Sequence, residues 1–183
     1  MAGIDGFVAH VASFREIEVF DVRPVSTQIP NVTFKQANLM ARESIEPLIA
    51  GGGYCDSLSC LHVLEHFGLG RYGDPIDPNG YKTGFANLAS LLRPGARFYL
   101  STPIGKERVE FNANWVFAPA TILRLAAAQD LLLDRFAVFN SRTGLREIKD
   151  TERRETFAAL TGEHYNLGIF VFTKPPVCTG ESP

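Results

Sequence analysis

The sequence predicts an α/β domain with a doubly wound, mostly parallel sheet that ends in an antiparallel hairpin. Segments with helical periodicity alternate with apolar, strand-like segments between residues 7 and 140. Two later strand-like segments, 131–140 and 167–173, are separated only by a polar stretch, as in a hairpin with a long connection. The 183 residues, 45% of them hydrophobic, fit one domain over 1–173 with a flexible tail over 174–183.

The first elements follow from the positions of apolar residues and of helix and strand breakers. Phe7 to Phe14 has helical spacing, and the strand expected over 16–22 ends at Arg23-Pro24. After a second strand over 32–37, we expect a helix over 42–50 despite Pro47. Three consecutive glycines then terminate this helix.

The remaining elements are expected with the same criteria. The most secure pair is an amphipathic helix through Phe85 and Leu92, stopped by Pro94-Gly95, and the strand that follows it over 96–101. The other expected segments are a strand over 54–60, a helical turn over 61–67, a long loop over 68–80, a helix over 119–129, strands over 131–140 and 167–173, and a solvated polar insertion over 141–164.

Composition excludes several classes of partner. A net charge of −2 and a pI of about 6.1 give no general attraction to nucleic acid or anionic lipid. The opening MAGIDGFVAHVASF does not resemble a signal peptide, and no uncharged apolar run approaches the ~20 residues of a membrane span. Cys55, Cys60 and Cys178 form no C-x-x-C pair, which favours a reducing compartment. We therefore expect a cytoplasmic protein whose partner is a small molecule.

Two polar residues follow the first two strands, at the edge where α/β sheets bind ligands. The carboxylate of Asp21 can accept hydrogen bonds from both ribose hydroxyls of a nucleoside cofactor. Alternatively, Asp21 pairs with Arg23 or caps the turn. Asn38, just past the second strand, can bind an adenine edge through its amide.

A third polar group follows the strand over 54–60. His62, Glu65 and His66 lie where an imidazole and a carboxylate could orient an acceptor or take its proton. Alternatively, His66 caps the short helix or binds a backbone carbonyl. The same residues match the H-x-x-E-H pattern of zinc hydrolases, but Gly68 and Gly70 interrupt the helix that a zinc site would need. We therefore expect no metal.

Charged residues also occur in the two longest loops. Arg71 and Asp74 lie in the loop over 68–80, and Arg108 and Glu110 follow the strand over 96–101. An arginine there could grip an anionic or sugar-like acceptor, and Asp74 or Glu110 could act as a base. For each residue, the alternative is ordinary turn chemistry.

Together these motifs resemble the class I S-adenosylmethionine-dependent methyltransferases. The likeness rests on Asp21 after a strand, on Asp56 opening another strand, and on the helix before Pro94-Gly95. More narrowly, the chain resembles the domain of unknown function 268 family. The segments that carry this likeness are CLHVLEHFGLGRYGDPIDPNG and STPIGKERVEFNANWVF.

The resemblance implies a site for S-adenosylmethionine. Asp21 would hold the ribose, Asn38 would lie near the adenine, and His62, Glu65 and His66 would line the cofactor and acceptor side. The resemblance also places Ser59 in the cofactor site, together with the tail of a glycine-rich turn formed by Gly3, Asp5 and Gly6.

The first strand of such a sheet is missing from the sequence. Because this strand is normally central, its two neighbours must either pair with each other or leave an opening for another chain. An unpaired sheet would favour self-association into a homo-oligomer.

The function implied is methyl transfer to a small, sugar-like hydroxyl acceptor. The alternatives are a binding domain of the same fold without catalysis and, third, a zinc hydrolase through His62, Glu65 and His66.

Overall fold

The computed structural model describes residues 6–25, 29–70, 75–110 and 113–176. Its main sheet has five strands in the order β3-β4-β9-β7-β8. These strands are β3 (Cys55–Leu61), β4 (Leu92–Ile104), β9 (Asn166–Thr173), β7 (Leu132–Asn140) and β8 (Gly144–Ile148). Two smaller sheets pair β1 (Ile17–Asp21) with β2 (Val32–Gln36), and β5 (Arg108–Val109) with β6 (Trp115–Val116).

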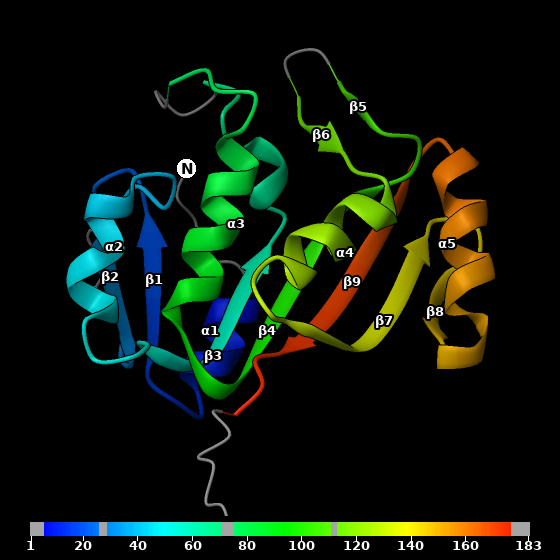
Figure 1. Cartoon of the computed structure of the whole chain (residues 1–183). Coiled ribbons are helices and arrows are strands. Elements are labelled where there is room, and N and C mark those ends of the chain that lie inside the picture. The colour runs from blue at the N-terminus through cyan, green and yellow to red at the C-terminus, as the bar shows by residue number, and fades with distance from the viewer. Residues whose placement is uncertain (1–5, 26–28, 71–74, 111–112, 177–183) are drawn as a thin grey trace, which may run out of the picture.

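Strand directions confirm the predicted α/β fold with its C-terminal antiparallel hairpin. β1 and β2 are parallel, as are β3 and β4, whereas β9 runs antiparallel to both β4 and β7. β7 therefore points the same way as β3 and β4, and Figure 1 shows β1 pointing in this direction too. The carboxyl ends of β1, β2, β3 and β4 consequently lie along one edge of the molecule.

Helices cover the two faces of the main sheet unequally. The helices are α1 (Gly6–Ala12), α2 (Arg42–Ile49), α3 (Gly80–Leu91), α4 (Pro119–Ala127) and α5 (Arg153–Gly162), with 3-10 turns η1 (Leu64–His66) and η2 (Asp150–Glu152). In Figure 1, α3 and α4 lie in front of the sheet and α1 behind it. None of the helices in the described residues is long and apolar enough to cross a membrane.

The core lies between the main sheet and the helices in front of it. Phe98 of β4 packs its ring edge-on against Phe85 of α3, with 5.6 Å between centroids. Phe136 of β7 similarly contacts Phe157 of α5 at 4.7 Å and Phe170 of β9 at 4.8 Å. This continuous aromatic cluster fixes α3 and the strand ends around it.

The junction between the β1–β2 sheet and the main sheet lies between β1 and β3 (Figure 1). In the described residues, β1 pairs with β2, and β3 pairs with β4. β1 and β3 therefore do not pair with each other. Tyr54, just before β3, links the two sheets instead. Its hydroxyl bonds Glu18 of β1 and Lys35 of β2, and its ring lies 6.2 Å from that of Phe20.

The helix before Pro94-Gly95 differs from the prediction at both ends. α3 begins at Gly80, and β4 begins at Leu92, so Pro94 and Gly95 lie inside the strand. Tertiary contacts explain this, because Leu92 pairs with Cys55 of β3 and the Gly95 amide donates to the Lys174 carbonyl at 2.8 Å. Pro94 and Gly95 lie where the register between β4 and β3 is irregular, with no ladder partner in β3, so the strand accommodates these local breakers as a bulge.

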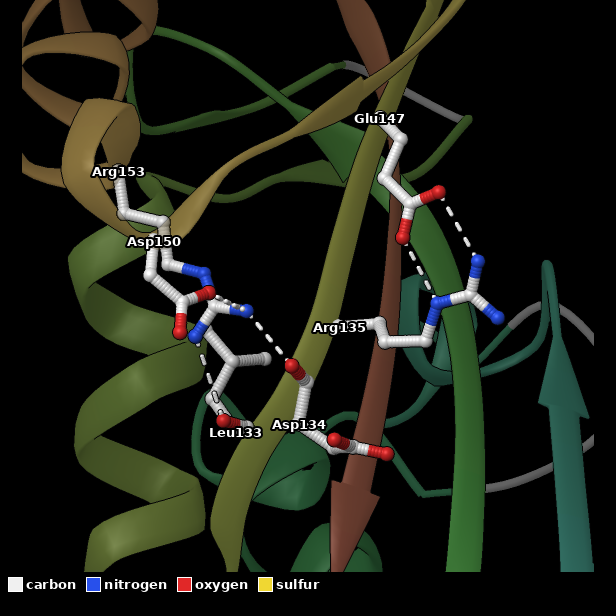
Figure 2. A network of polar contacts seen from close by, with 6 residues as sticks. All are labelled: Leu133, Asp134, Arg135, Glu147, Asp150 and Arg153. Atoms are coloured by element: carbon white, nitrogen blue, oxygen red, sulfur yellow. Dashed lines mark hydrogen bonds and ion pairs between the residues drawn. The ribbon is translucent and has the colours of Figure 1, made fainter.

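The polar stretch over 141–164, expected to be a solvated insertion, is mostly exposed but has regular structure that the sequence did not predict. It forms β8, η2 and α5, with Ile148 and Leu160 buried. Arg153, at the start of α5, donates to the carbonyls of Leu133 (3.3 Å) and Asp134 (2.6 Å) on β7 (Figure 2). Two buried apolar residues and one partly buried arginine thus dock a mostly charged segment.

Candidate functional site

A cavity of about 170 Å³ opens at the carboxyl ends of β1, β2 and β3. Its walls combine apolar side chains with a few polar ones, as in small-molecule sites. The apolar wall comprises Phe20, Val22, Ala37, Leu39, Met40, Val63 and Phe67, and the polar groups are Asp21, Arg23, Asn38, His62 and His66. Four residues predicted from the sequence, Asp21, Asn38, His62 and His66, therefore meet in one cavity.

Asp21, the last residue of β1, is engaged by Arg23. Its Oδ1 accepts from the Arg23 backbone amide at 2.9 Å and from Nε at 3.0 Å, and its Oδ2 accepts from Nη2 at 2.9 Å. Because the Arg23 hydrogen bonds stabilise the carboxylate, they lower the pKa of Asp21. This pairing is the alternative considered from the sequence. It still leaves an ionised acceptor at the cavity wall.

Asn38 forms a tight turn directly after β2. Its Oδ1 accepts from the Met40 amide at 3.0 Å, and its carbonyl accepts from the Ala41 amide at 2.9 Å. The turn leads into α2, and the adjacent Leu39 carbonyl is held by Asn87 of α3 at 2.9 Å. The side-chain amide of Asn38 is thereby fixed at the rim with Nδ2 as its donor.

His62 and Glu65 form a pair at the end of β3. His62 Nδ1 lies 3.1 Å from Glu65 Oε1, and Glu65 Oε2 accepts from the Thr102 hydroxyl at 3.3 Å. The imidazole is 50% exposed, whereas the Glu65 side chain is only 2% exposed. His62 has a positive φ of 56°, uncommon outside glycine, so the backbone turns sharply there.

Glu65 sets the protonation properties of His62. The hydrogen bond that His62 donates to Glu65 and the attraction of the Glu65 charge outweigh burial and raise the pKa of His62 above 6.5. When the ring is neutral, an ionised carboxylate can only accept, so Nδ1 carries the hydrogen and Nε2 is left as a proton acceptor. A half-exposed base oriented by a buried carboxylate can take a proton from a bound hydroxyl.

His66 plays a different part in this segment. Its Nδ1 lies 3.1 Å from the Ala113 carbonyl, which is the backbone contact considered as an alternative from the sequence. Residues 64–66 form a single 3-10 turn, so the two histidines do not occupy one face of an α-helix as a zinc hydrolase would require. No group of three metal-binding side chains occurs among the described residues.

Arg108 and Glu110 pair with each other beside the β5–β6 hairpin. Arg108 Nε donates to Glu110 at 2.7 Å, and Nη1 donates to the His164 carbonyl at 2.8 Å. Neither residue lines the cavity. Arg108 therefore ties the hairpin to the segment before β9.

The other predicted site residues lie elsewhere. Ser59 is exposed in the middle of β3, opposite Tyr99, and does not line the cavity. Gly6 is the first residue of α1. Gly3, Asp5 and Asp74 lie outside the described residues.

Thr102 and Tyr165 lie outside the cavity but interact with Glu65, and sequence reasoning missed both. Thr102 follows directly after Ser101 near the end of β4, so its position at a strand end was an available signal. Tyr165 precedes β9, and both burial and the Glu65 charge raise the pKa of its hydroxyl. No local signal marks Tyr165, because the antiparallel return of β9 alone brings it to this edge.

Comparison with known proteins places this geometry in a wider group. The model of a family described as Caenorhabditis protein of unknown function, DUF268, matches residues 52–159, which include His62, Glu65 and Thr102. No curated protein matches the sequence.

Three solved structures share the architecture. A SAM-dependent methyltransferase from Methanosarcina mazei is 12% identical, with a TM-score of 0.56 over 93% of this chain and 87% of that one. The 1,6-didemethyltoxoflavin-N1-methyltransferase of Burkholderia thailandensis, with bound 1,6-didemethyltoxoflavin and S-adenosylhomocysteine, is 16% identical, with a TM-score of 0.52 over 92% of this chain and 65% of that one. The N-methyltransferase NodS of Bradyrhizobium japonicum, in complex with S-adenosylhomocysteine, is 11% identical, with a TM-score of 0.51 over 86% of this chain and 66% of that one.

These likenesses show the fold, which is that of the class I methyltransferases. The chain spans 57%, 65% and 37% of the first three solved structures that it matches. Identity at this level does not extend to substrates.

Proposed function

We propose, from the premise that this chain belongs to the DUF268 family and has the class I methyltransferase fold, that it binds S-adenosylmethionine and methylates a small hydroxyl acceptor. The observation that carries the proposal is the convergence of Asp21, Asn38 and the His62–Glu65 pair on one cavity edge. Asp21 and Asn38 suit the binding of a nucleoside, and the His62–Glu65 pair suits the removal of a proton from an acceptor.

The cavity residues fit the nucleoside part of the cofactor. Asp21 supplies carboxylate oxygens for ribose hydroxyls, and Asn38 supplies an amide for an adenine edge. Apolar side chains such as Leu39 and Met40 offer a flat wall for the base. At about 170 Å³, the cavity is below the usual range of ~300 to 1,000 Å³, so it would enclose only part of the cofactor.

His62 would act as the general base. The cofactor, when bound, supplies a methyl group on a positively charged sulfur. His62 Nε2 takes the proton of the acceptor hydroxyl, and the resulting imidazolium is stabilised by Glu65. Most of the rate enhancement is expected from positioning the acceptor, because the cofactor carries the reactive group.

The binding half of the proposal is tested with S-adenosylhomocysteine by isothermal titration calorimetry. Asp21→Asn keeps the shape of the side chain but removes its charge, so we expect affinity to fall by about 1 to 3 kcal/mol. Glu147→Gln is the matched control, because Glu147 forms a similar two-bond pair with Arg135, at 2.7 and 2.9 Å, on the β7–β8 strands (Figure 2). Equal losses in both variants would contradict the assignment of Asp21.

A binding domain without catalysis is the second candidate. The pairing of Asp21 with Arg23 favours it, because a ribose would have to share or displace those hydrogen bonds. Under this alternative, S-adenosylhomocysteine binds but no methyl transfer occurs with any hydroxyl compound. A screen of sugars and polyols that follows release of S-adenosylhomocysteine separates the two candidates, and any acceptor-dependent release rules out the second.

A further inference from the structure

We propose that Thr102 is the positioning residue of this site: its hydroxyl fixes the buried Glu65 carboxylate, which in turn holds His62 with Nδ1 protonated and Nε2 free to accept a proton. The catalytic consequence rests on the proposed function, whereas the positioning itself does not. Thr102 does not line the cavity, so its influence passes through Glu65.

The Glu65 carboxylate is bonded on both of its oxygens. Among the described residues, its hydrogen bonds come from His62 at Oε1 and Thr102 at Oε2. With 2% of the side chain exposed, bulk water contributes little to solvating the charge. Loss of the Thr102 hydroxyl would leave one oxygen unsatisfied and the carboxylate free to rotate away from His62.

Thr102 is itself held rigidly. It is fully buried in β4, where it is paired with Gly168 of β9 on one side and follows Ser101, the partner of Leu61 in β3. Its branched Cβ restricts the χ1 angle, so the hydroxyl has few alternative directions. A donor with this little freedom can fix the orientation of a carboxylate.

The end of β4 holds the His62–Glu65 pair at two points. The Ser101 carbonyl accepts from the His62 backbone amide at 3.0 Å, and the next residue, Thr102, bonds the Glu65 side chain. The first contact fixes where His62 leaves β3, at its unusual positive φ. The second fixes the carboxylate toward which its ring turns. Two successive residues of one strand thus define both ends of the pair.

Two other titratable groups face Glu65. Burial and the Glu65 charge together raise the pKa of the Cys60 thiol to about 12, and they raise that of Tyr165 as well. Both therefore remain neutral at physiological pH and respond to the charge of Glu65 without balancing it. His62 and Thr102 are left as the groups that stabilise this charge.

Nitrogen-detected NMR of the histidine rings tests the positioning directly. In the unmodified chain at a pH where His62 is neutral, we expect one tautomer, with Nδ1 bearing the hydrogen. Thr102→Val should convert this signal to the mixture of tautomers typical of an unrestrained histidine, and Thr102→Ser should restore the single tautomer. An unchanged His62 spectrum in Thr102→Val would overturn the proposal.

Thr121→Val is the matched control. Thr121 is also buried and also donates its hydroxyl to a glutamate, Glu107, but it lies in α4 away from His62. We expect the His62 signals of the Thr121→Val variant to match those of the unmodified chain. If Thr121→Val altered the spectrum as much as Thr102→Val, the effect would come from general loosening and the proposal would be rejected.

Titration with S-adenosylhomocysteine separates this inference from the proposed function. Thr102→Val should bind this ligand as tightly as the unmodified chain, and with an identified acceptor its kcat should fall about ten-fold or more. Loss of the single tautomer in a chain that does not bind the ligand would uphold positioning and reject the methyltransferase. If the chain binds S-adenosylhomocysteine but the His62 tautomer is unchanged in Thr102→Val, the positioning role of Thr102 is rejected and the methyltransferase proposal stands.

Discussion

His62 is half exposed, whereas the carboxylate that orients it is buried, and this asymmetry has consequences for pH. Its pKa is raised by Glu65, so the ring stays protonated to higher pH than in the unfolded chain. A group whose pKa is raised by folding contributes its full stabilisation at any pH below the pKa that it has in the unfolded chain. This contribution is lost as the pH rises through the pKa that the group has in the folded chain. Base catalysis has the opposite dependence, because it requires the neutral ring.

We therefore predict opposite pH profiles for stability and for activity. As pH rises from about 6 to about 9, the free energy of unfolding should decline slightly relative to that of His62→Asn, in which the titrating group is absent. Over the same interval, any acceptor-dependent turnover should increase. Urea unfolding at several pH values, with and without the substitution, checks the stability part, and parallel curves for the two proteins would contradict it.

Gly84 illustrates how one residue sets the shape of the cavity. A Cβ at this position of α3 would lie 2.1 Å from Cδ2 of Phe67, whose ring lines the cavity. We predict that Gly84→Ala lowers the free energy of unfolding by about 1 to 3 kcal/mol and weakens S-adenosylhomocysteine binding, because Phe67 must move.

Gly162 provides the matched comparison. It is also helical, in α5, but a Cβ there meets nothing within 4 Å. Gly162→Ala should be neutral or stabilising by a few tenths to about 1 kcal/mol. Thermal unfolding of both variants measures the contrast. Equal destabilisation would mean that contact with Phe67 is not the cause.

At the scale of elements, the contact between the β1–β2 sheet and the main sheet depends on few groups. In the part of the chain that the structure describes, the two sheets share no backbone ladder, and Tyr54 bonds both Glu18 and Lys35 across the junction. For Glu18, desolvation opposes ionisation, but the hydrogen bonds from Tyr54 and Lys35 prevail and lower its pKa. Side chains thus replace the hydrogen bonds that a shared strand would provide.

We predict that Tyr54→Phe loosens this junction specifically. The substitution keeps the ring near Phe20 but removes the hydroxyl that both charged partners use. Amide hydrogen exchange in β1 and β2 should accelerate, whereas exchange in β9 and β7 should not change. Tyr99→Phe, in the centre of the main sheet, is the comparison. Uniform acceleration across all strands would contradict a local role for Tyr54.

On the scale of the whole molecule, the C-terminal part extends the main sheet and closes one end of its core. β8 adds an outer strand beside β7, and α5 places Phe157 against Phe136. Arg153 joins these parts, since it donates to two carbonyls of β7 and forms a 2.6 Å ion pair with Asp150 (Figure 2). The expected self-association of the chain stays a prediction.

Arg153→Met should destabilise the whole domain, because a partly buried arginine with several partners supports the attachment of α5. We expect a loss of about 1 to 3 kcal/mol in the free energy of unfolding, measured with urea. Arg146→Met is the control: Arg146 is 62% exposed and pairs with Glu152 at 3.6 Å, so its loss should change stability by about 1 kcal/mol or less. Similar losses in both variants would show that Arg153 has no special role.

The sequence by itself determined the order of most elements before residue 140 and four of the five polar residues of the cavity. Periodicity located α1, α2 and α4 and the strands β1, β2, β3 and β7, because amphipathic patterns reflect burial on one face. Asp21, Asn38 and His62 were found because they follow strands, and parallel strands bring their carboxyl ends to one edge.

Tertiary structure alone decided the remaining features. Pro94-Gly95 entered β4 as an irregularity in its register with β3, because the Leu92–Cys55 pair and the bond from the Gly95 amide to the Lys174 carbonyl hold the chain on either side. The charged segment over 141–164 folded because β7 offered a docking surface. Arg108 and Glu110 follow a strand but pair with each other away from the cavity. Thr102 acquires its role only when β4 lies beside β3, since residues 37 positions apart in the chain must meet before one can hold the other.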